Sequence, residues 1–169
     1  KQYLTPFGEY IPLRPLARKV SHLVDQVSDF SAGDESKVFT IEKTKFSPII
    51  CFELLNDALI EKSAKSGNLL AVQTNSATFG RSAESSQQLS ISRIRAIEHT
   101  RNLVSVSTTG YSAVINYKGQ MVQKTSMGTA ESLYASIGLI DKQSPRDYLG
   151  GWASFLSLMW LLITARKRS

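Results

Sequence analysis

The sequence contains few of the residues that build disulfide frameworks or metal centres. Its 169 residues include one cysteine, Cys51, and two histidines, His22 and His99. A single cysteine cannot form an internal disulfide, and two distant histidines without cysteine partners lack the spacing of a zinc site. We therefore expect no metal and no organic cofactor.

Charge is also sparse and only weakly basic. Charged residues make up 20% of the chain, and three of the positive charges behind its net +6 lie in the terminal residues 166–168. There is no basic stripe with interleaved aromatic residues, so we expect no nucleic-acid partner. A hydrophobic content of 42% fits one globular domain with a real core. The chain starts at Lys1 without a methionine or a signal peptide, which suggests the tail of a longer protein.

Residues 149–165, "LGGWASFLSLMWLLITA", contain no charged side chain. Its large apolar side chains fall on every side of a helix, and at about 1.5 Å per residue it reaches roughly 25 Å. That length is close to the lower limit for crossing a bilayer, and basic residues follow at once. We expect a transmembrane helix at 148–165 and a basic cytoplasmic tail at 166–169. A buried terminal helix of a soluble domain is the alternative.

The earlier residues alternate between strand and helix patterns. Strands are predicted in 38–53, 68–75, 103–110, 111–119 and 121–126, and helices in 56–67 and 84–102. The first of these ranges is expected to form two strands with a turn around 42–45, and the last two strands a hairpin turning at Lys118-Gly119. Residues 14–37 are polar and mixed, which is typical of a loop or a short helix. The pattern predicts an α/β sheet with helices packed on it.

Cys51 lies at the carboxyl end of an apolar strand, where α/β sheets bind their ligands. Asn75-Ser76 and Gly110 end two further strands, so three strand ends are expected to meet at one edge. A free thiol has a pKa of about 8.5, so a nucleophilic Cys51 would need a base or a cation nearby. Buried apolar filler is the alternative for a single cysteine.

Five segments carry a resemblance to a known family: "KQYLTPFGEY", "IICFE", "NSATFG", "RIRAIEHTRN" and "TTGYSAVI". In order and approximate spacing they resemble the carbon-nitrogen hydrolase (nitrilase) superfamily. Within it, they are most similar to the C-terminal part of the apolipoprotein N-acyltransferase family. The resemblance covers nearly the whole chain, with 14–37 and 120–147 matching poorly. It implies that residues 1–147 are the C-terminal part of a nitrilase-like αββα sandwich.

The resemblance also implies a Glu-Lys-Cys triad. Cys51 matches the nucleophile and Lys1 the lysine that stabilises the oxyanion, while the glutamate base belongs to a segment before Lys1. Cys51 would take an acyl chain from a phospholipid as a thioester and pass it to the N-terminal amine of a lipidated apolipoprotein. The protein is then expected in the bacterial cytoplasmic membrane, with its catalytic domain on the extracytoplasmic side. The 169-residue chain alone is expected to be inactive, because it lacks the base.

Three residues match positions that support the triad in this family. Glu9 is expected to orient Lys1, with a solvated loop carboxylate as the alternative. Glu53 is expected to be a structural hydrogen-bonding partner beneath the nucleophile. Phe52 replaces the usual tyrosine, and its N–H is expected to help bind the oxyanion.

Residues 75–80 match the family's substrate loop, in which Asn75, Phe79 and Gly80 are expected to bind substrate. This chain reads Asn-Ser-Ala-Thr-Phe-Gly where the family commonly has Asn-Asp-Ala-Trp-Phe-Gly, so an aspartate and a tryptophan are lost. The matching helix residues Arg95 and Glu98 are expected to form a fold-holding ion pair.

Two alternative functions remain open at this point. The first is a nitrilase-type amidase acting on a small amide, in which residues 149–165 would form a core or oligomer helix. The second is an inactive membrane-anchored fragment, which the altered loop and the missing glutamate favour.

Overall fold

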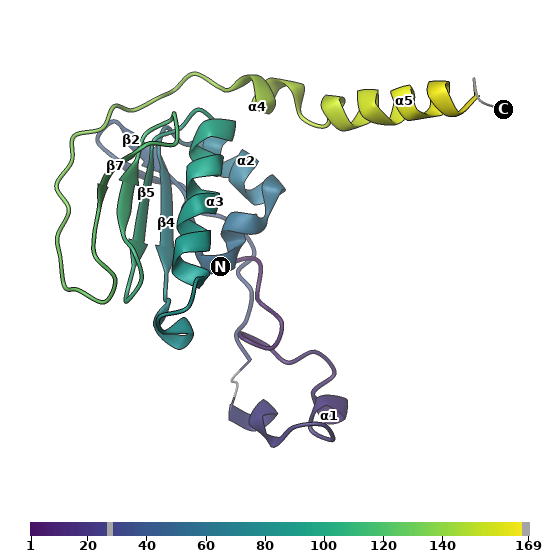
Figure 1. Ribbon diagram of the computed structural model, residues 1–169, viewed down its shortest axis with the longest axis vertical. Helices are drawn as coiled ribbons and strands as arrows, with labels where there is room; N and C mark the ends of the chain where they lie inside the picture. Colours follow the sequence, from purple (N-terminus) through teal and green to yellow (C-terminus); the bar gives the residue numbers. More distant parts are fainter. Residues whose placement is uncertain (27–28, 167–169) are drawn as a thin grey trace.

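The computed structural model describes residues 1–26 and 29–166 and is built around one mixed sheet. The strands lie in the order β3 (Pro48–Ile50), β4 (Leu70–Thr74), β5 (Leu103–Ser107), β6 (Ala113–Ile115) and β7 (Met121–Lys124). The first three are parallel, and β6 and β7 continue the sheet antiparallel. Helices α2 (Asp57–Ser66) and α3 (Glu84–Glu98) lie together on one face (Figure 1). The expected α/β sheet is confirmed.

Helix α2 shows how local residues set the element boundaries. The side chain of Asn56 accepts a hydrogen bond from the Leu59 amide at 2.9 Å and caps the first turn. The helix ends at Gly67, where a Cβ would come within 2.7 Å of the Lys45 carbonyl oxygen. Only a residue without a Cβ therefore allows the chain at position 67 to pass so close to the strand that contains Lys45.

The core lies between the sheet and the two helices. Along β4, buried side chains alternate with side chains that are more accessible, which is the period-2 pattern of a strand covered on one face. The fully buried apolar residues come from every layer: Ile49, Leu54, Ile60, Ala64, Leu70, Val72, Ala96, Leu103, Ala113 and Ile115. Packing of these residues holds the parallel strand ends in fixed register.

Residues 38–53 form three short strands, where two were expected. β1 (Phe39–Ile41) and β2 (Thr44–Phe46) make a separate antiparallel hairpin, turned at Glu42 with a φ of 52°. The chain then starts β3 at Pro48, which pairs with β4. Proline has no N–H to donate and is tolerated as the first residue of a strand, so the apolar run is divided there.

Residues 14–37 form an excursion beside the sheet domain (Figure 1). Within its described part lie α1 (Arg14–Ala17) and the 3₁₀ helix η1 (His22–Gln26). Two ion pairs brace it, from Arg14 to Asp29 and from Arg18 to Asp25, each at 2.7 Å. The sequence left a loop and a short helix as alternatives, and the described residues contain both.

The C-terminal region corrects the expectation of one continuous helix over 148–165. Helix α4 (Pro145–Leu149) ends at Gly150, whose φ of 53° turns the chain, and α5 (Trp152–Arg166) begins beyond it. In the described residues, no helix is both long and apolar enough to cross a membrane. Residues 167–169 of the expected basic tail lie outside the described part.

Helix α5 extends away from the sheet domain (Figure 1). Its large apolar side chains are exposed: Trp152, Phe155, Leu156, Leu158, Met159, Trp160, Leu161, Leu162 and Ile163. The expectation of a buried terminal helix therefore does not fit these residues.

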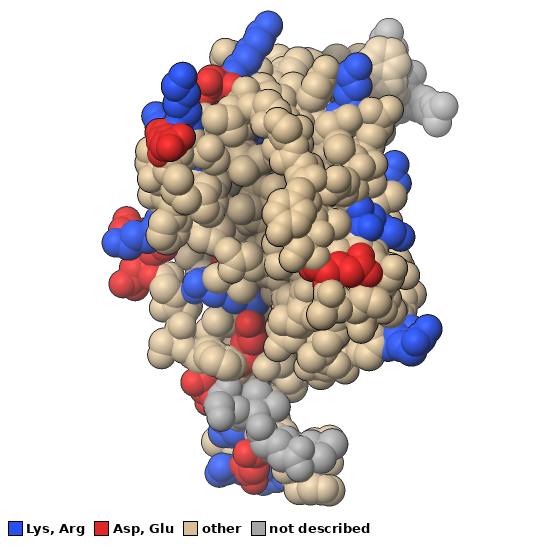
Figure 2. Space-filling model, turned by 90° about the vertical axis from the view of Figure 1, so that its left-hand side faces the viewer, with Lys and Arg blue, Asp and Glu red and all other residues tan. Residues whose placement is uncertain are grey.

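The described residues supply one helix layer and one main sheet, whereas an αββα sandwich requires a second sheet against the first. Figure 2 views the molecule from the side of β7 and the 126–143 segment, and this side is largely uncharged, with Lys, Arg, Asp and Glu scattered mainly around its rim. The complete sandwich remains a prediction for the protein that carries this chain.

Candidate active site around Cys51

Cys51 is the first residue after β3 and opens the 3₁₀ helix η2 (Cys51–Leu55). Its φ of 56° lies in the left-handed region, which residues with a Cβ rarely adopt. The thiol is partly buried and lines a cavity of about 110 Å³ between η2 and α3. Backbone strain of this kind concentrates at functional sites, where the surrounding structure maintains it.

The surroundings of Cys51 act on its ionisation in opposite directions. Burial raises the pKa of the thiol, while the Phe52 amide and the charge of Lys1 oppose this rise. The carboxylates of Glu9 and Glu84 raise the pKa further, and the net pKa lies above its ordinary value. The thiol is therefore protonated at neutral pH, and its use as a nucleophile requires a base.

Lys1 and Glu9 form a close ion pair, and the charges of both act on this thiol. Lys1 Nζ lies 2.5 Å from Glu9 Oε2, and the lysine side chain is only 9% exposed. Burial raises the pKa of Glu9, but the hydrogen bonds from Lys1 and from the Thr5 amide outweigh it and bring the net pKa below its ordinary value. Glu9 is therefore ionised at neutral pH and holds the ammonium of Lys1 in place.

Glu53 is buried and links the segment of Lys1 to the strand that carries Cys51. Its Oε1 accepts hydrogen bonds from the amides of Gln2 at 2.6 Å and Tyr3 at 3.1 Å, and its Oε2 accepts one from Ile50 at 2.9 Å. One carboxylate thus joins the residues that follow Lys1 to the residue that precedes Cys51. The expected structural position of Glu53 matches these contacts.

The loop after β4 is tied to the end of β5. Asn75 Oδ1 accepts hydrogen bonds from the Thr108 hydroxyl at 2.8 Å and the Ala77 amide at 3.1 Å. The hydroxyls of Ser107 and Ser76 lie 3.0 Å apart. The ends of β4 and β5 therefore meet as expected. The side-chain oxygen of Asn75 is occupied by hydrogen bonds within this region.

The aromatic ring of Phe79 brings this loop into contact with the residue that follows Cys51. It packs edge-on against Phe52, the residue after Cys51, with the ring centroids 6.2 Å apart. Both rings remain more than a third exposed and form a rim beside the thiol. Gly80 turns the chain with a φ of 53°, and its amide donates a hydrogen bond to the Ala77 carbonyl oxygen at 3.3 Å. That these loop residues bind substrate remains a prediction.

Glu84 is a site residue that the sequence did not indicate. It is the first residue of α3 and lines the cavity of Cys51. Acidic residues are common in the first turn of any helix, so the pattern gave no reason to select it. Its position in the cavity depends on how α3 packs against η2, which no local motif reveals.

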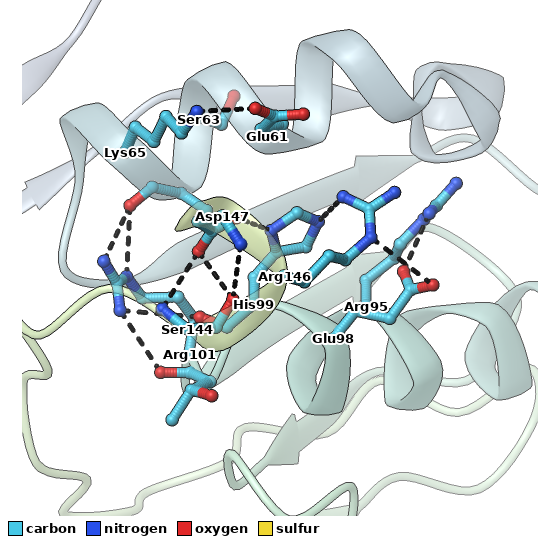
Figure 3. A network of polar contacts seen from close by, with 12 residues as sticks. Glu61, Ser63, Lys65, Arg95, Glu98, His99, Arg101, Ser144, Arg146 and Asp147 are labelled. Carbon is cyan, nitrogen blue, oxygen red and sulfur yellow. Dashed lines mark hydrogen bonds and ion pairs between the residues drawn. The ribbon is translucent and has the colours of Figure 1, made fainter. Parts of the chain in front are cut away.

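A second polar cluster lies around His99, at the end of α3 (Figure 3). The buried ring donates from Nδ1 to Asp147 Oδ1 at 2.6 Å, and Arg146 Nη1 lies 3.4 Å from Nε2. Burial lowers the pKa of His99, and Asp147 offsets only part of this effect, so the ring is neutral at pH 7. The cluster fastens α4 to α3. Over residues 1–26 and 29–166, no group of His, Cys, Asp and Glu could hold a metal ion.

Nearby guanidinium groups stabilise the same region. The expected ion pair from Arg95 to Glu98 is present at 2.8 Å, and Arg95 also reaches Asp57 at 2.6 Å. Arg101 is buried and donates to backbone carbonyls, among them those of Ala64 at 2.8 Å and Lys142 at 2.6 Å (Figure 3). Through these contacts, Arg95 and Arg101 stabilise the packing of neighbouring segments.

Comparison with known proteins supports the resemblance found in the motifs. The sequence pattern of the carbon-nitrogen hydrolase family matches residues 6–146. The chain is 30% identical to an apolipoprotein N-acyltransferase of Photobacterium profundum over 177 residues, covering 100% of this chain and 34% of that protein. It is 36% identical to the one of Mycolicibacterium smegmatis over 126 residues, covering 74% of this chain and 21% of that protein. The chain thus spans about a third or less of the length of these relatives.

Solved structures support the fold. The glutamine-dependent NAD+ synthetase of Acinetobacter baumannii aligns with a TM-score of 0.54 at 17% identity, over 60% of this chain and 21% of that one. Nit3 of Saccharomyces cerevisiae, a member of branch 10 of the nitrilase superfamily, aligns with a TM-score of 0.50 at 20% identity, over 59% and 40% of the two chains. With a family match over most of its length and a nitrilase-like α/β fold, the chain belongs to the carbon-nitrogen hydrolase family.

Proposed function

We propose that the protein carrying this chain is an apolipoprotein N-acyltransferase. It would move an acyl chain from a phospholipid to Cys51 and then to the N-terminal amine of a lipidated apolipoprotein. The names of the relatives support this reaction, and the positions of Cys51 and Lys1 fit its chemistry.

The steps follow from the groups around the thiol. The Cys51 thiolate attacks the ester carbonyl, and the Lys1 ammonium and the Phe52 N–H stabilise the oxyanion. Collapse of this intermediate releases a lysophospholipid and leaves a thioester on Cys51. The acceptor amine attacks the thioester, forms an amide and regenerates the thiolate. The base that takes the proton of the Cys51 thiol before this attack is the glutamate that the family resemblance assigns to a segment before Lys1.

The observation that carries the lipid assignment is the exposed apolar surface of α5. An apolar helix without a packing partner in the described chain is typical of a surface that meets lipid or another apolar partner. An apolar cavity of about 560 Å³ is lined by residues of the excursion, such as Leu16 and Val24, and of the segment just before it, such as Leu13. Its volume and apolar lining suit a hydrocarbon chain. We therefore propose a site at the extracytoplasmic surface of the bacterial cytoplasmic membrane.

Transfer of a labelled acyl chain tests this function. The protein as its gene encodes it is incubated with acyl-labelled phospholipid and a diacylglyceryl lipopeptide that has a free N-terminal amine. We expect label in an amide of the lipopeptide, loss of this product in Cys51→Ala, and full activity in Glu61→Gln, which alters an exposed pair on α2.

Hydrolysis of a small amide is measured in parallel. An amidase would release ammonia from the amide and leave the lipopeptide unlabelled. That pair of results would contradict the acyltransferase and support the alternative function.

A further inference from the structure

Glu84 has a different environment from the other carboxylates of the site. Glu9 is paired with Lys1, and Glu53 accepts three backbone amides. Glu84 lines the cavity of Cys51, and both of its carboxyl oxygens are buried without a hydrogen-bond partner among the described residues. Its side chain is therefore available to whatever enters the cavity.

Burial without a partner favours the neutral acid, because an isolated ionised carboxylate is costly away from water. Burial raises the pKa of Glu84, and the nearby Ser76 hydroxyl opposes only part of this rise without the geometry of a hydrogen bond. Cys51 lines the same cavity, and Lys1 and Glu9 are the other charged groups that act on the thiol. A carboxyl group that titrates closer to neutrality, next to a nucleophile, is suited to acid–base chemistry.

We propose that Glu84 is an acid–base group of the Cys51 cavity. This proposal rests on the acyl transfer proposed above. When the first tetrahedral intermediate collapses, the C–O bond of the ester breaks and neutral Glu84 gives its proton to the departing alcohol. When the amine attacks the thioester, the C–S bond breaks, the carboxylate of Glu84 takes the proton from nitrogen, and the thiolate is restored.

Glu84→Gln in the protein as its gene encodes it tests this role. We expect kcat for acyl transfer to fall about 100-fold and its pH profile to lose one limb. The melting temperature should be equal or higher, because the change removes an unpartnered buried carboxyl group. Glu84→Asp retains the acid and should recover part of both the rate and the pH limb. Glu61→Gln makes the same chemical change at an exposed pair and should leave all three measurements unchanged.

The pH dependence of Cys51 alkylation by iodoacetamide gives a readout that needs no substrate. Because the Glu84 charge raises the pKa of the thiol, Glu84→Gln should move the alkylation profile to lower pH by about half a unit to one unit. An unchanged profile in Glu84→Gln overturns the proposal, and so does wild-type turnover by this variant. If the alkylation shift occurs but the wild-type protein transfers no acyl chain, the proposed function fails, while the coupling of Glu84 to Cys51 stands.

Discussion

At the residue scale, the carboxylates near Cys51 have different environments: Glu9 is paired with Lys1, and Glu53 accepts hydrogen bonds from three backbone amides. Glu84 has no hydrogen-bond partner among the described residues. The apolar run before Cys51 predicts a strand end, and the structure has β3 ending there. The contacts of Lys1 and Glu9 followed from the family motif, whereas composition and spacing alone favoured a solvated Glu9. The left-handed φ of Cys51 and the buried carboxyl of Glu84 were not predictable, because both depend on how η2 and α3 pack.

Glu53 offers a stability test at this scale. Glu53→Ala leaves the amides of Gln2, Tyr3 and Ile50 without their acceptor in a buried site. We expect a loss of about 2–4 kcal/mol in the free energy of unfolding, measured by urea denaturation. Glu35→Ala removes one partner of an exposed pair and should change stability by less than about 0.5 kcal/mol. Equal stability of the two variants would contradict the structural role of Glu53.

At the element scale, local signals predicted the helices better than the strands. Asn56 and Gly67 mark the ends of α2, and apolar spacing indicates α3. The division of 38–53 into β1, β2 and β3 depends on pairing with β4, which is distant in sequence. The break between α4 and α5 at Gly150 was not predicted, because the apolar run continues through this residue. Glycine can adopt both helical and left-handed conformations, so its presence alone does not indicate a break.

The docking of α4 on α3 predicts a pH dependence of stability. Folding lowers the pKa of His99, mainly by burial, so the folded state favours the neutral ring. The contribution of His99 to the free energy of unfolding is therefore complete above its unfolded pKa of about 6.5. This contribution decreases as the pH falls from there toward the lower pKa of the folded state. The pKa of Asp147 is also lowered, because its hydrogen bonds from Ser144 and His99 outweigh burial, so this carboxylate stays ionised over that interval.

Urea midpoints at pH 7 and pH 5.5 measure this effect. We expect the wild-type midpoint to fall on acidification, and His99→Gln to reduce the fall. His22→Gln, a change at an exposed histidine, should retain the wild-type slope. A slope that depends on His22 and not on His99 would show that the buried pair does not control stability.

At the scale of the whole molecule, the α/β architecture could be predicted from the alternation of strand and helix patterns. Two apolar features lie outside the sheet domain: the exposed side chains of α5 and the cavity lined by residues between Phe7 and Val24. Residues 149–165 read as uniformly apolar, but a sequence pattern does not state what covers such a surface.

The central claim is that the Cys51 thiol accepts an acyl chain from phospholipid. Intact-protein and peptide mass spectrometry test it most directly, after the protein as its gene encodes it has been incubated with phospholipid and no acceptor. We expect a mass increase of one acyl group on the peptide that contains Cys51, reversed by hydroxylamine and absent in Cys51→Ala. An unmodified Cys51 in protein that releases lysophospholipid, or an acyl group on another residue, would contradict it.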